Sequence, residues 1–357
     1  MTTKNLVGLG VAAVVLGGAA YFCGSGRKIK SASVNGKPVM TAFNVADVAR
    51  LEVGGAKKLA LAATDKGWTV ESLFGYPADV TKIRENLMKL SELKVGQVAP
   101  GVKIASPVAV TLKDAKGKEL SSVTLGEQHR SKPKGEAAMY GGGYPDGRYV
   151  KFGEKTVLVK DALDAFDGDF KKWIDARICA VPSADVKAVT YAKGKEKVEL
   201  TRKDSAWTLA GLGPKEELDT SKTYSLDSAL SYLDLTGVAD PKLTEQDLGF
   251  ATGSVYTVQL KDGKSYTANV GNAKGSDRYF KVAAAFKATG TNAVENAKLE
   301  KAVKEFNDKT AKWVYTISSY SADSMSKTRK DLVKAKAEEK KPDEKKADAK
   351  KADEKKN

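Results

Sequence analysis

The chain has 357 residues, of which 41% are hydrophobic and 8% aromatic, and its formal net charge is +15. This length gives room for about two domains with real cores. Much of the charge lies near the ends, because residues 327–357 hold 13 Lys/Arg against 8 Asp/Glu and four more cations flank the first apolar run. No segment interleaves aromatic residues with arginine as nucleic-acid platforms do, so we expect no nucleic-acid partner.

Residues 5–23 form a run of 19 uncharged residues that follows a short N-terminal flank at 1–4. At the rise of an α-helix the run comes close to the ~30 Å hydrocarbon core of a bilayer. Tyr21 and Phe22 stand where interfacial aromatic residues stand in membrane helices. We therefore predict a transmembrane anchor at 5–23, which makes the membrane a partner of this chain.

Three other interpretations of the apolar run stay open. Gly18 and Ala20 are small residues of the kind that precede a signal-peptide cleavage site. Cys23 is a candidate for lipid modification, and a cytoplasmic core helix is the remaining alternative. The flanking positive charges differ by one between the two sides, so they do not decide the orientation. Cys23 and Cys179 are the two cysteines, and the position of Cys23 argues against a disulfide between them.

The segment 24–42 is predicted to be a linker hairpin, because Asn35-Gly36 is a strong signal for a type I′ turn. The first folded unit is expected at 43–182. It opens with apolar residues at strand spacing and with Trp68-Thr69-Val70 after a turn. Asp79 is the predicted N-cap of a helix. One helix face carries apolar residues at spacings of three and four, namely Val80, Ile83, Leu87 and Leu90.

An antiparallel strand pair is predicted after Pro100, followed by a glycine-rich loop at 139–147 and the strand Arg148-Tyr149-Val150. A closing helix is expected from about Asp161. Its apolar residues are Leu163, Phe166, Phe170 and Trp173.

A second unit at 183–317 repeats this order. Trp207-Thr208-Leu209 matches Trp68-Thr69-Val70, and Arg278-Tyr279-Phe280 matches Arg148-Tyr149-Val150. A helix capped by Asp219 or Thr220 is expected to carry Leu226, Leu230 and Leu233, and a closing helix to carry Leu299, Val303, Phe306 and Trp313. The fold class predicted is α+β: two tandem similar units of mainly antiparallel sheet, each with two helices, after an N-terminal transmembrane helix. The tryptophans are expected to pack helix onto sheet.

The last segment, 318–357, is rich in Lys, Glu and Ala. Such a composition cannot bury enough apolar surface to offset the entropy of the chain. We predict a disordered, solvated tail, and a contact with an anionic surface or partner is the alternative.

The sequence presents no constellation of residues that defines a reaction. His129 is the single histidine and is expected to be a surface residue in a polar loop, which makes a zinc site or a histidine-based triad hard to build. The glycines at 141–143 precede a strand rather than a helix and are interpreted as a hairpin loop. Four aspartates near Gly168 lack the spacing of a calcium loop and are interpreted as caps and surface charge: Asp161, Asp164, Asp167 and Asp169. We assign no catalytic, cofactor-binding or metal-binding residue and expect no cofactor.

Several of these features together resemble the bacterial domain-of-unknown-function 4340 (DUF4340) family. They are the N-terminal run, the Trp-Thr-Val/Leu strands, the helix that follows, the Leu248-Gly249-Phe250 segment and the Arg-Tyr-aromatic strands. The resemblance covers roughly 43–317. It implies a single N-terminal anchor, a location outside the cytoplasm and an association with ABC-type transport components of the gliding-motility kind. The family has no established catalytic residues to transfer.

We therefore expect a non-enzymatic, single-pass inner-membrane protein whose bulk is periplasmic. Its expected function is that of a scaffold or accessory subunit of a membrane complex, with protein partners in that complex. An extracytoplasmic module that binds a glycan or another ligand is the alternative. A hydrolase that uses two carboxylates is a minor alternative.

Overall fold

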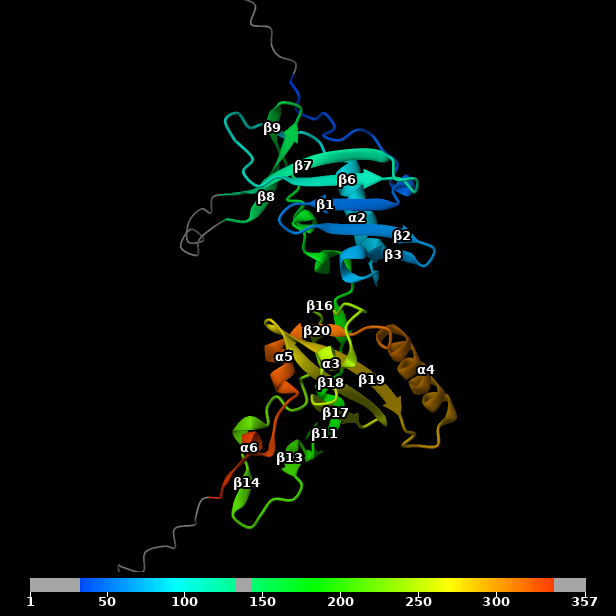
Figure 1. Cartoon of the computed structure of the whole chain (residues 1–357), viewed down its shortest axis with the longest axis vertical. Helices are drawn as coiled ribbons and strands as arrows, with labels where there is room; N and C mark the ends of the chain where they lie inside the picture. Colours follow the sequence, from blue (N-terminus) through cyan, green and yellow to red (C-terminus); the bar gives the residue numbers. More distant parts are fainter. Residues whose placement is uncertain (1–32, 132–142, 337–357) are drawn as a thin grey trace, which may run out of the picture. The chain divides into compact units, whose positions relative to one another are not determined.

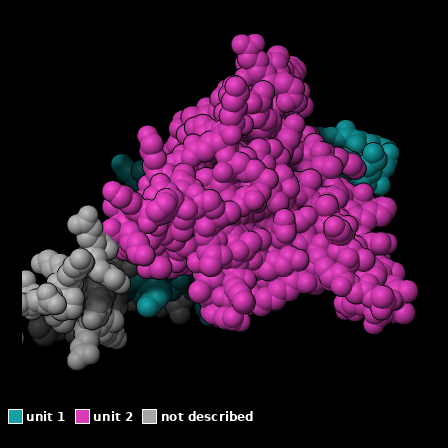
Figure 2. All heavy atoms as spheres, turned by 90° about the horizontal axis from the view of Figure 1, so that it is seen from below, with its two compact units in different colours: residues 1–68, 79–173 teal, residues 69–78, 174–357 magenta. Residues whose placement is uncertain are grey.

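The computed structural model describes residues 33–131 and 143–336 (Figure 1). They divide into two compact units, drawn in different colours in Figure 2. Unit 1 comprises residues 1–68 and 79–173, and unit 2 comprises 69–78 and 174–357. Each unit is built on an antiparallel sheet, so the sheet-rich α+β class predicted from the sequence is confirmed.

The first sheet has the strand order β4-β3-β2-β1-β6-β7-β8-β9-β5, in which β4 and the end of β3 fall in residues 69–78, the segment grouped with unit 2. Its strands are β1 (Arg50–Gly54), β2 (Leu59–Thr64), β3 (Gly67–Val70), β4 (Tyr76–Pro77), β5 (Gln97–Val98), β6 (Val108–Lys113), β7 (Glu119–Arg130), β8 (Pro145–Phe152) and β9 (Lys155–Val159). Alternate residues of the central strands are buried, as Leu51, Val53, Val110 and Leu112 illustrate.

Helix α2 (Val80–Ser91) lies across one face of this sheet (Figure 1). The predicted N-cap is confirmed, because the Asp79 carboxylate accepts the backbone N–H of Thr81 at 2.9 Å. Ile83, Leu87 and Leu90 are buried as predicted, whereas Val80 is 54% exposed and does not belong to the buried face. The predicted apolar face is therefore correct for Ile83, Leu87 and Leu90 but not for Val80.

The closing helix predicted from Asp161 does not form. The chain instead makes 3₁₀ turns at Asp164–Phe166 and Phe170–Trp173. Two residues in the left-handed region interrupt the helical path, Leu163 at φ 49° and Gly168 at φ +80°. Trp173 is nevertheless fully buried, as its predicted packing role requires. Its indole lies edge-on to Phe166, with ring centres 5.3 Å apart.

The sheet of unit 2 has the order β13-β12-β11-β17-β18-β19-β20-β16. Its strands are β11 (Val186–Lys193), β12 (Glu196–Lys203), β13 (Ala206–Leu209), β16 (Gly237–Val238), β17 (Ser254–Leu260), β18 (Lys264–Lys274), β19 (Asp277–Phe286) and β20 (Tyr315–Ser318). Two short pairs stand outside this sheet, β10 (Arg177–Cys179) with β15 (Leu233–Asp234) and β14 (Glu216–Leu218) with β21 (Val333–Ala335). The eight strands of the second sheet thus follow the same order as the strands from β3 to β5 of the first sheet, and β4 has no counterpart in the second sheet.

The two helices predicted for unit 2 have different outcomes. Helix α4 (Ala293–Thr310) forms and runs alongside β19 (Figure 1). The Asn307 side chain fixes it there, accepting the N–H of Ala284 at 2.8 Å and donating to its carbonyl at 2.9 Å. Trp313 lies beyond the end of α4, so its assignment to the helix was wrong.

The helix predicted after Asp219 is absent as such. Asp219 caps only a 3₁₀ turn, Thr220–Lys222, and turns follow as far as residue 232. Hydroxyl side chains compete here for backbone groups, as when Thr223 donates to the Thr220 carbonyl at 2.8 Å. Leu226 and Leu230 are still fully buried. The apolar spacing therefore located the core but not the helix.

The predicted boundary of the tail at 318 is too early. Residues 318–336 fold as α5 (Ser319–Ser324), α6 (Arg329–Leu332) and β21. Three fully buried side chains hold this segment on unit 2, namely Ala322, Met325 and Leu332. The guanidinium of Arg329 also pairs with the Glu216 carboxylate. The rest of the predicted tail, 337–357, lies outside the described residues.

The linker predicted at 24–42 is described from residue 33 onward. The Asn35-Gly36 turn is present, with the Lys37 N–H donating to the Val34 carbonyl at 3.1 Å. Of these two residues only Gly36 has a positive φ, and Pro38 pairs with Lys94 rather than with a preceding strand. The turn therefore leads the chain alongside residues 93–95 and is not the tip of a hairpin. Helix α3 (Glu245–Leu248) precedes β17 in the chain.

No helix among residues 33–131 and 143–336 is long and apolar enough to cross a membrane, and the anchor predicted at 5–23 lies outside these ranges.

Candidate functional site

Arg148, on strand β8 of unit 1, is a buried charged residue, and the exposed fraction of its surface is 3%. Its Nε donates to the Gly126 carbonyl at 2.8 Å, and its Nη1 donates to the Leu163 carbonyl at 2.9 Å. Leu163 has a positive φ of 49°, an unfavourable conformation for a branched residue. The guanidinium thus holds two irregular backbone segments that flank the sheet.

A β-bulge in strand β7 presents the Gly126 carbonyl to Arg148. The register between β7 and β8 shifts between Leu125 and Gln128. Glycine is needed at 126, because a Cβ there would lie 2.8 Å from the Ile104 side chain. The next residue, Glu127, accepts the backbone N–H groups of Ala105 and Ser106, both at 3.0 Å. Together with its own N–H, these donors hold the pKa of the Glu127 carboxyl below its usual range.

A cleft of about 690 Å³ opens beside this bulge. Its lining includes two further cations, Lys57 and Arg130, and the carboxylates of Glu127 and Asp167. Asp167 pairs with the Arg148 Nη1 at 2.7 Å, although its side chain is 45% exposed. Fixed charges of both signs on a rigid backbone suit recognition of a polar ligand. A depressed carboxyl pKa does not suit proton donation.

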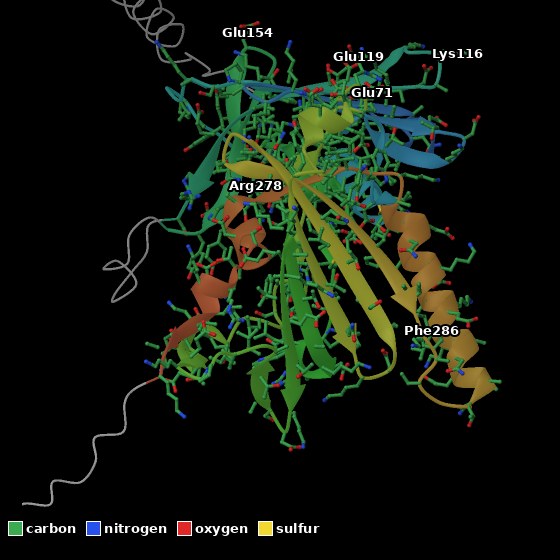
Figure 3. All side chains as sticks on the ribbon, turned by 60° about the horizontal axis from the view of Figure 1, so that its bottom comes forward. Glu71, Lys116, Glu119, Glu154, Arg278 and Phe286 are labelled. Carbon is green, nitrogen blue, oxygen red and sulfur yellow. The ribbon has the colours of Figure 1, made fainter. Side chains whose placement is uncertain are left out.

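Unit 2 repeats the arrangement in weaker form at Arg278, labelled in Figure 3 at the opposite end of β19 from Phe286. Its Nη1 donates to the Gly271 carbonyl at 3.3 Å, again beside a register shift, here between Val270 and Ala273. A Cβ at Gly271 would lie 2.1 Å from the Leu248 carbonyl oxygen. Asn272 takes the place of Glu127 and donates to the Asp247 carbonyl at 3.1 Å. We call each set of arginine, glycine and bulge an arginine clamp.

Sequence reasoning marked both arginines as matched positions but did not assign them a role. The glycine that each guanidinium contacts lies inside the bulge of a strand whose sequence looks ordinary. An isolated glycine inside a strand pattern was the signal that could have indicated the bulge.

His129 lies within β7, not in the loop predicted for it. Its Nδ1 is 2.5 Å from an Asp146 carboxylate oxygen, and its ring lies edge-on to Tyr149 with centres 5.8 Å apart. Strand pairing extends to Arg130 because Pro145 pairs with that residue. The imidazole is about one-third exposed, in agreement with its prediction as a surface residue. Of the glycine-rich loop predicted at 139–147, residues 139–142 lie outside the described ranges.

The four aspartates near Gly168, which were interpreted as caps and surface charge, divide into two that accept backbone N–H groups and two that form ion pairs. Asp161 accepts the Leu163 N–H at 2.8 Å, and Asp169 accepts the Lys171 N–H at 3.0 Å. Asp164 pairs with Lys172 at 2.9 Å, and Asp167 pairs with Arg148. In the part of the chain that the structure describes, no three His, Cys, Asp or Glu side chains are grouped to hold a metal ion.

Cys179 is a free, buried thiol on β10. Burial raises its pKa to about 12, so it remains protonated and unreactive at neutral pH. Cys23 lies outside the described residues.

The fold and the two clamps define a sheet-rich α+β protein whose arginines fix bulged strands. The chain belongs to the family described as Domain of unknown function (DUF4340), which matches residues 68–253. The match begins in β3 and ends immediately before β17, so it takes in parts of both units. The resemblance drawn from the sequence is thus confirmed. No curated protein and no solved structure matches the chain.

Proposed function

We propose that the two units are tandem copies of one structural repeat. The support is the shared strand order and the arginine clamp at matching positions of both sheets. If the two units had separate origins, both would have had to acquire the same order of eight strands and the same contact between an arginine and a bulge. The repeats differ at one sheet edge, where only the first sheet has β4, and in their longest helix, which is α2 in one unit and α4 in the other.

We further propose that the protein is a non-catalytic, single-pass inner-membrane protein with its bulk in the periplasm. Its function in this proposal is that of a scaffold or accessory subunit of a membrane complex of the ABC-transport or gliding-motility type. The observation that carries the proposal is the uncharged run at 5–23 ahead of two sheet units. A rigid sheet repeat behind a single anchor suits the presentation of a surface to partner proteins.

The test is fractionation of cells that express the full chain, followed by alkaline extraction of the membranes. We expect the chain to stay in the membrane pellet and a periplasmic topology reporter fused after residue 336 to be active. Val14→Arg with Val15→Arg should release it, because each charge at a helix centre costs roughly 2.5–3.5 kcal/mol on insertion. Retention of that variant would contradict the anchor. Cys23→Ser serves as the matched control and separates lipid attachment from a spanning helix.

Partner capture follows from the same preparation. Affinity purification from mild detergent should recover a membrane protein complex with the chain. Repeated recovery of the chain alone would count against the accessory role.

A ligand- or glycan-binding module is the second candidate, favoured by the cleft beside Arg148 with its fixed charges. A thermal-shift screen with envelope glycans would give a stabilising hit if this function holds, and Lys57→Ala should reduce it. A flat response across the glycans would remove the candidate.

A carboxylate-based hydrolase is the minor alternative. A general acid needs a raised carboxyl pKa. Among the described residues, the carboxyl groups whose pKa is shifted are all lowered. This direction favours the non-catalytic proposal.

A further inference from the structure

A groove of about 830 Å³ lies on unit 1 between strands β7 to β9 and the loop that follows β5. One wall is apolar and is formed by Val98, Val102 and Ile104 with two prolines. Val98 is 37% exposed at the end of β5, and the other two are half-buried. This volume is in the range of pockets that hold small amphiphilic ligands.

Three lysines line the same groove, Lys103 from the loop, Lys151 from β8 and Lys155 from β9. Glu154 is the one carboxylate of the lining, so the groove carries a net charge of +2. Within residues 33–131 and 143–336 none of the three ammonium groups has an ion-pair partner. Apolar stems with free cationic ends beside an apolar wall complement a ligand with an anionic head and a hydrocarbon tail.

The groove is close to the point where the chain enters unit 1. The Gly36 N–H donates to the Val95 carbonyl at 2.7 Å, and the Val39 N–H donates to the Leu93 carbonyl at 2.9 Å. Residues 93–95 lead directly into β5 and the groove loop. Ser33 is ten positions after Cys23, a length of chain that spans at most about 35 Å. A membrane that held residues 5–23 would therefore lie within one short link of this end of unit 1.

We propose that this groove binds an anionic phospholipid, with the lipid phosphate at Lys103, Lys151 and Lys155 and an acyl chain along Val98, Val102 and Ile104. The placement at a bilayer surface rests on the membrane anchoring proposed above. An acidic peptide is the less favoured occupant. A bound strand needs a row of unpaired backbone groups, and β5 at this edge is only two residues long.

The test measures binding of a fluorescent short-chain phosphatidylglycerol to the full chain in neutral detergent by anisotropy. Unlabelled phosphatidylglycerol should displace it. Phosphatidylcholine of the same chain length lacks the net charge, and glycerol phosphate lacks the tails, so neither should compete at the same concentration. Equal competition by phosphatidylcholine or by glycerol phosphate would overturn the lipid assignment, as would stronger competition by an acidic peptide.

The variant Lys103→Gln/Lys151→Gln/Lys155→Gln should lose affinity by about fivefold per lysine, roughly a hundredfold in all. The matched control changes three other exposed lysines of unit 1, Lys66, Lys116 and Lys118, and should stay within about twofold of the parent. Figure 3 shows Lys116 well away from Glu154 at the groove rim. Equal losses in the two variants would refute a specific site.

The folded state of both variants is checked by their circular dichroism and melting curves. If the groove variant fails to fold, Val102→Asp and Ile104→Asp replace it one at a time, with the same expected loss. Failure of membrane fractionation would refute the anchor and leave this binding result intact. Fractionation as expected with no selective phosphatidylglycerol binding would refute the groove proposal alone.

Discussion

Replacing Arg148 by methionine keeps an unbranched apolar stem but removes the guanidinium with its five donors. The buried Gly126 carbonyl then loses its donor at 2.8 Å, and the Leu163 carbonyl loses one donor at 2.9 Å but keeps the Phe166 N–H at 3.1 Å. A buried acceptor left unpaired costs ~1–3 kcal/mol. The Asp167 ion pair adds less than ~1 kcal/mol, because that carboxylate is 45% exposed. We expect Arg148→Met to destabilise unit 1 by about 3 kcal/mol.

The matched variant Arg278→Met removes one bond of 3.3 Å from a half-buried guanidinium, so its expected cost is about 1 kcal/mol. Hydrogen exchange with mass spectrometry on the full chain separates the two sheets, which a global melting curve would not. The amides of β7 should exchange roughly a hundredfold faster in Arg148→Met, and those of β18 about fivefold faster in Arg278→Met. Arg130→Met, which changes an exposed arginine of the same strand, should leave β7 unaltered. A rise in β7 exchange below about fivefold, or one matched by Arg130→Met, would refute the clamp.

Three other outcomes follow from the structure. Leu332 is fully buried in α6, so Leu332→Ala should lower the free energy of unfolding by ~2–5 kcal/mol and expose residues 319–336 to limited proteolysis. The control variant Lys330→Ala should leave the digest unchanged. Equal protection in both variants would contradict the role of Leu332 as an anchor. Asp331 accepts hydrogen bonds from the Thr328 N–H and hydroxyl, which lower the pKa of its carboxyl group. Its contribution to stability is therefore present above the pKa of the unfolded state, near 4, and is lost as the pH falls through the pKa of the folded state. Urea midpoints between pH 6 and 3 should fall more for the parent than for Asp331→Asn, and parallel curves would refute this. In the variant Cys23→Ser, Cys179 is the single cysteine and should resist iodoacetamide at pH 8 until denaturant is added. If the folded chain is modified as fast as a model thiol, the β10 region opens in solution.

Much of the fold follows from local patterns in the sequence. The Asp79 cap, the buried face of α2 and the antiparallel pair β6 and β7 need only neighbouring residues to be recognised. The errors lie where tertiary context outweighs the apolar period. Gly168 breaks the helix expected after Asp161, and the hydroxyl side chains after Asp219 leave only turns around Leu226.

The candidate site was less accessible to sequence reasoning for the same kind of reason. The clamp joins Arg148 to Gly126 and Leu163, residues 22 and 15 positions away, and such a pairing depends on the bulge rather than on any spacing. The groove lysines come from a loop and two different strands. Composition alone showed only that the chain is basic.

The start of the tail was predicted too early because residues 318–336 are held by contacts with residues distant in the sequence. Residues 318–336 carry few apolar side chains, and only the contacts of Ala322, Met325 and Leu332 with the rest of unit 2 reveal that they are folded.

The pairing of β14 with β21 has a consequence for the way the chain becomes folded. Glu216 of β14 pairs with Ala335, so one partner is synthesised well over a hundred residues before the other. Until β21 arrives, β14 presents unpaired backbone groups along an open strand edge. Closing so long a loop is slow compared with the local hairpins of the main sheet. This part of unit 2 therefore closes only after residue 335 has been synthesised, later than the hairpins of the main sheet.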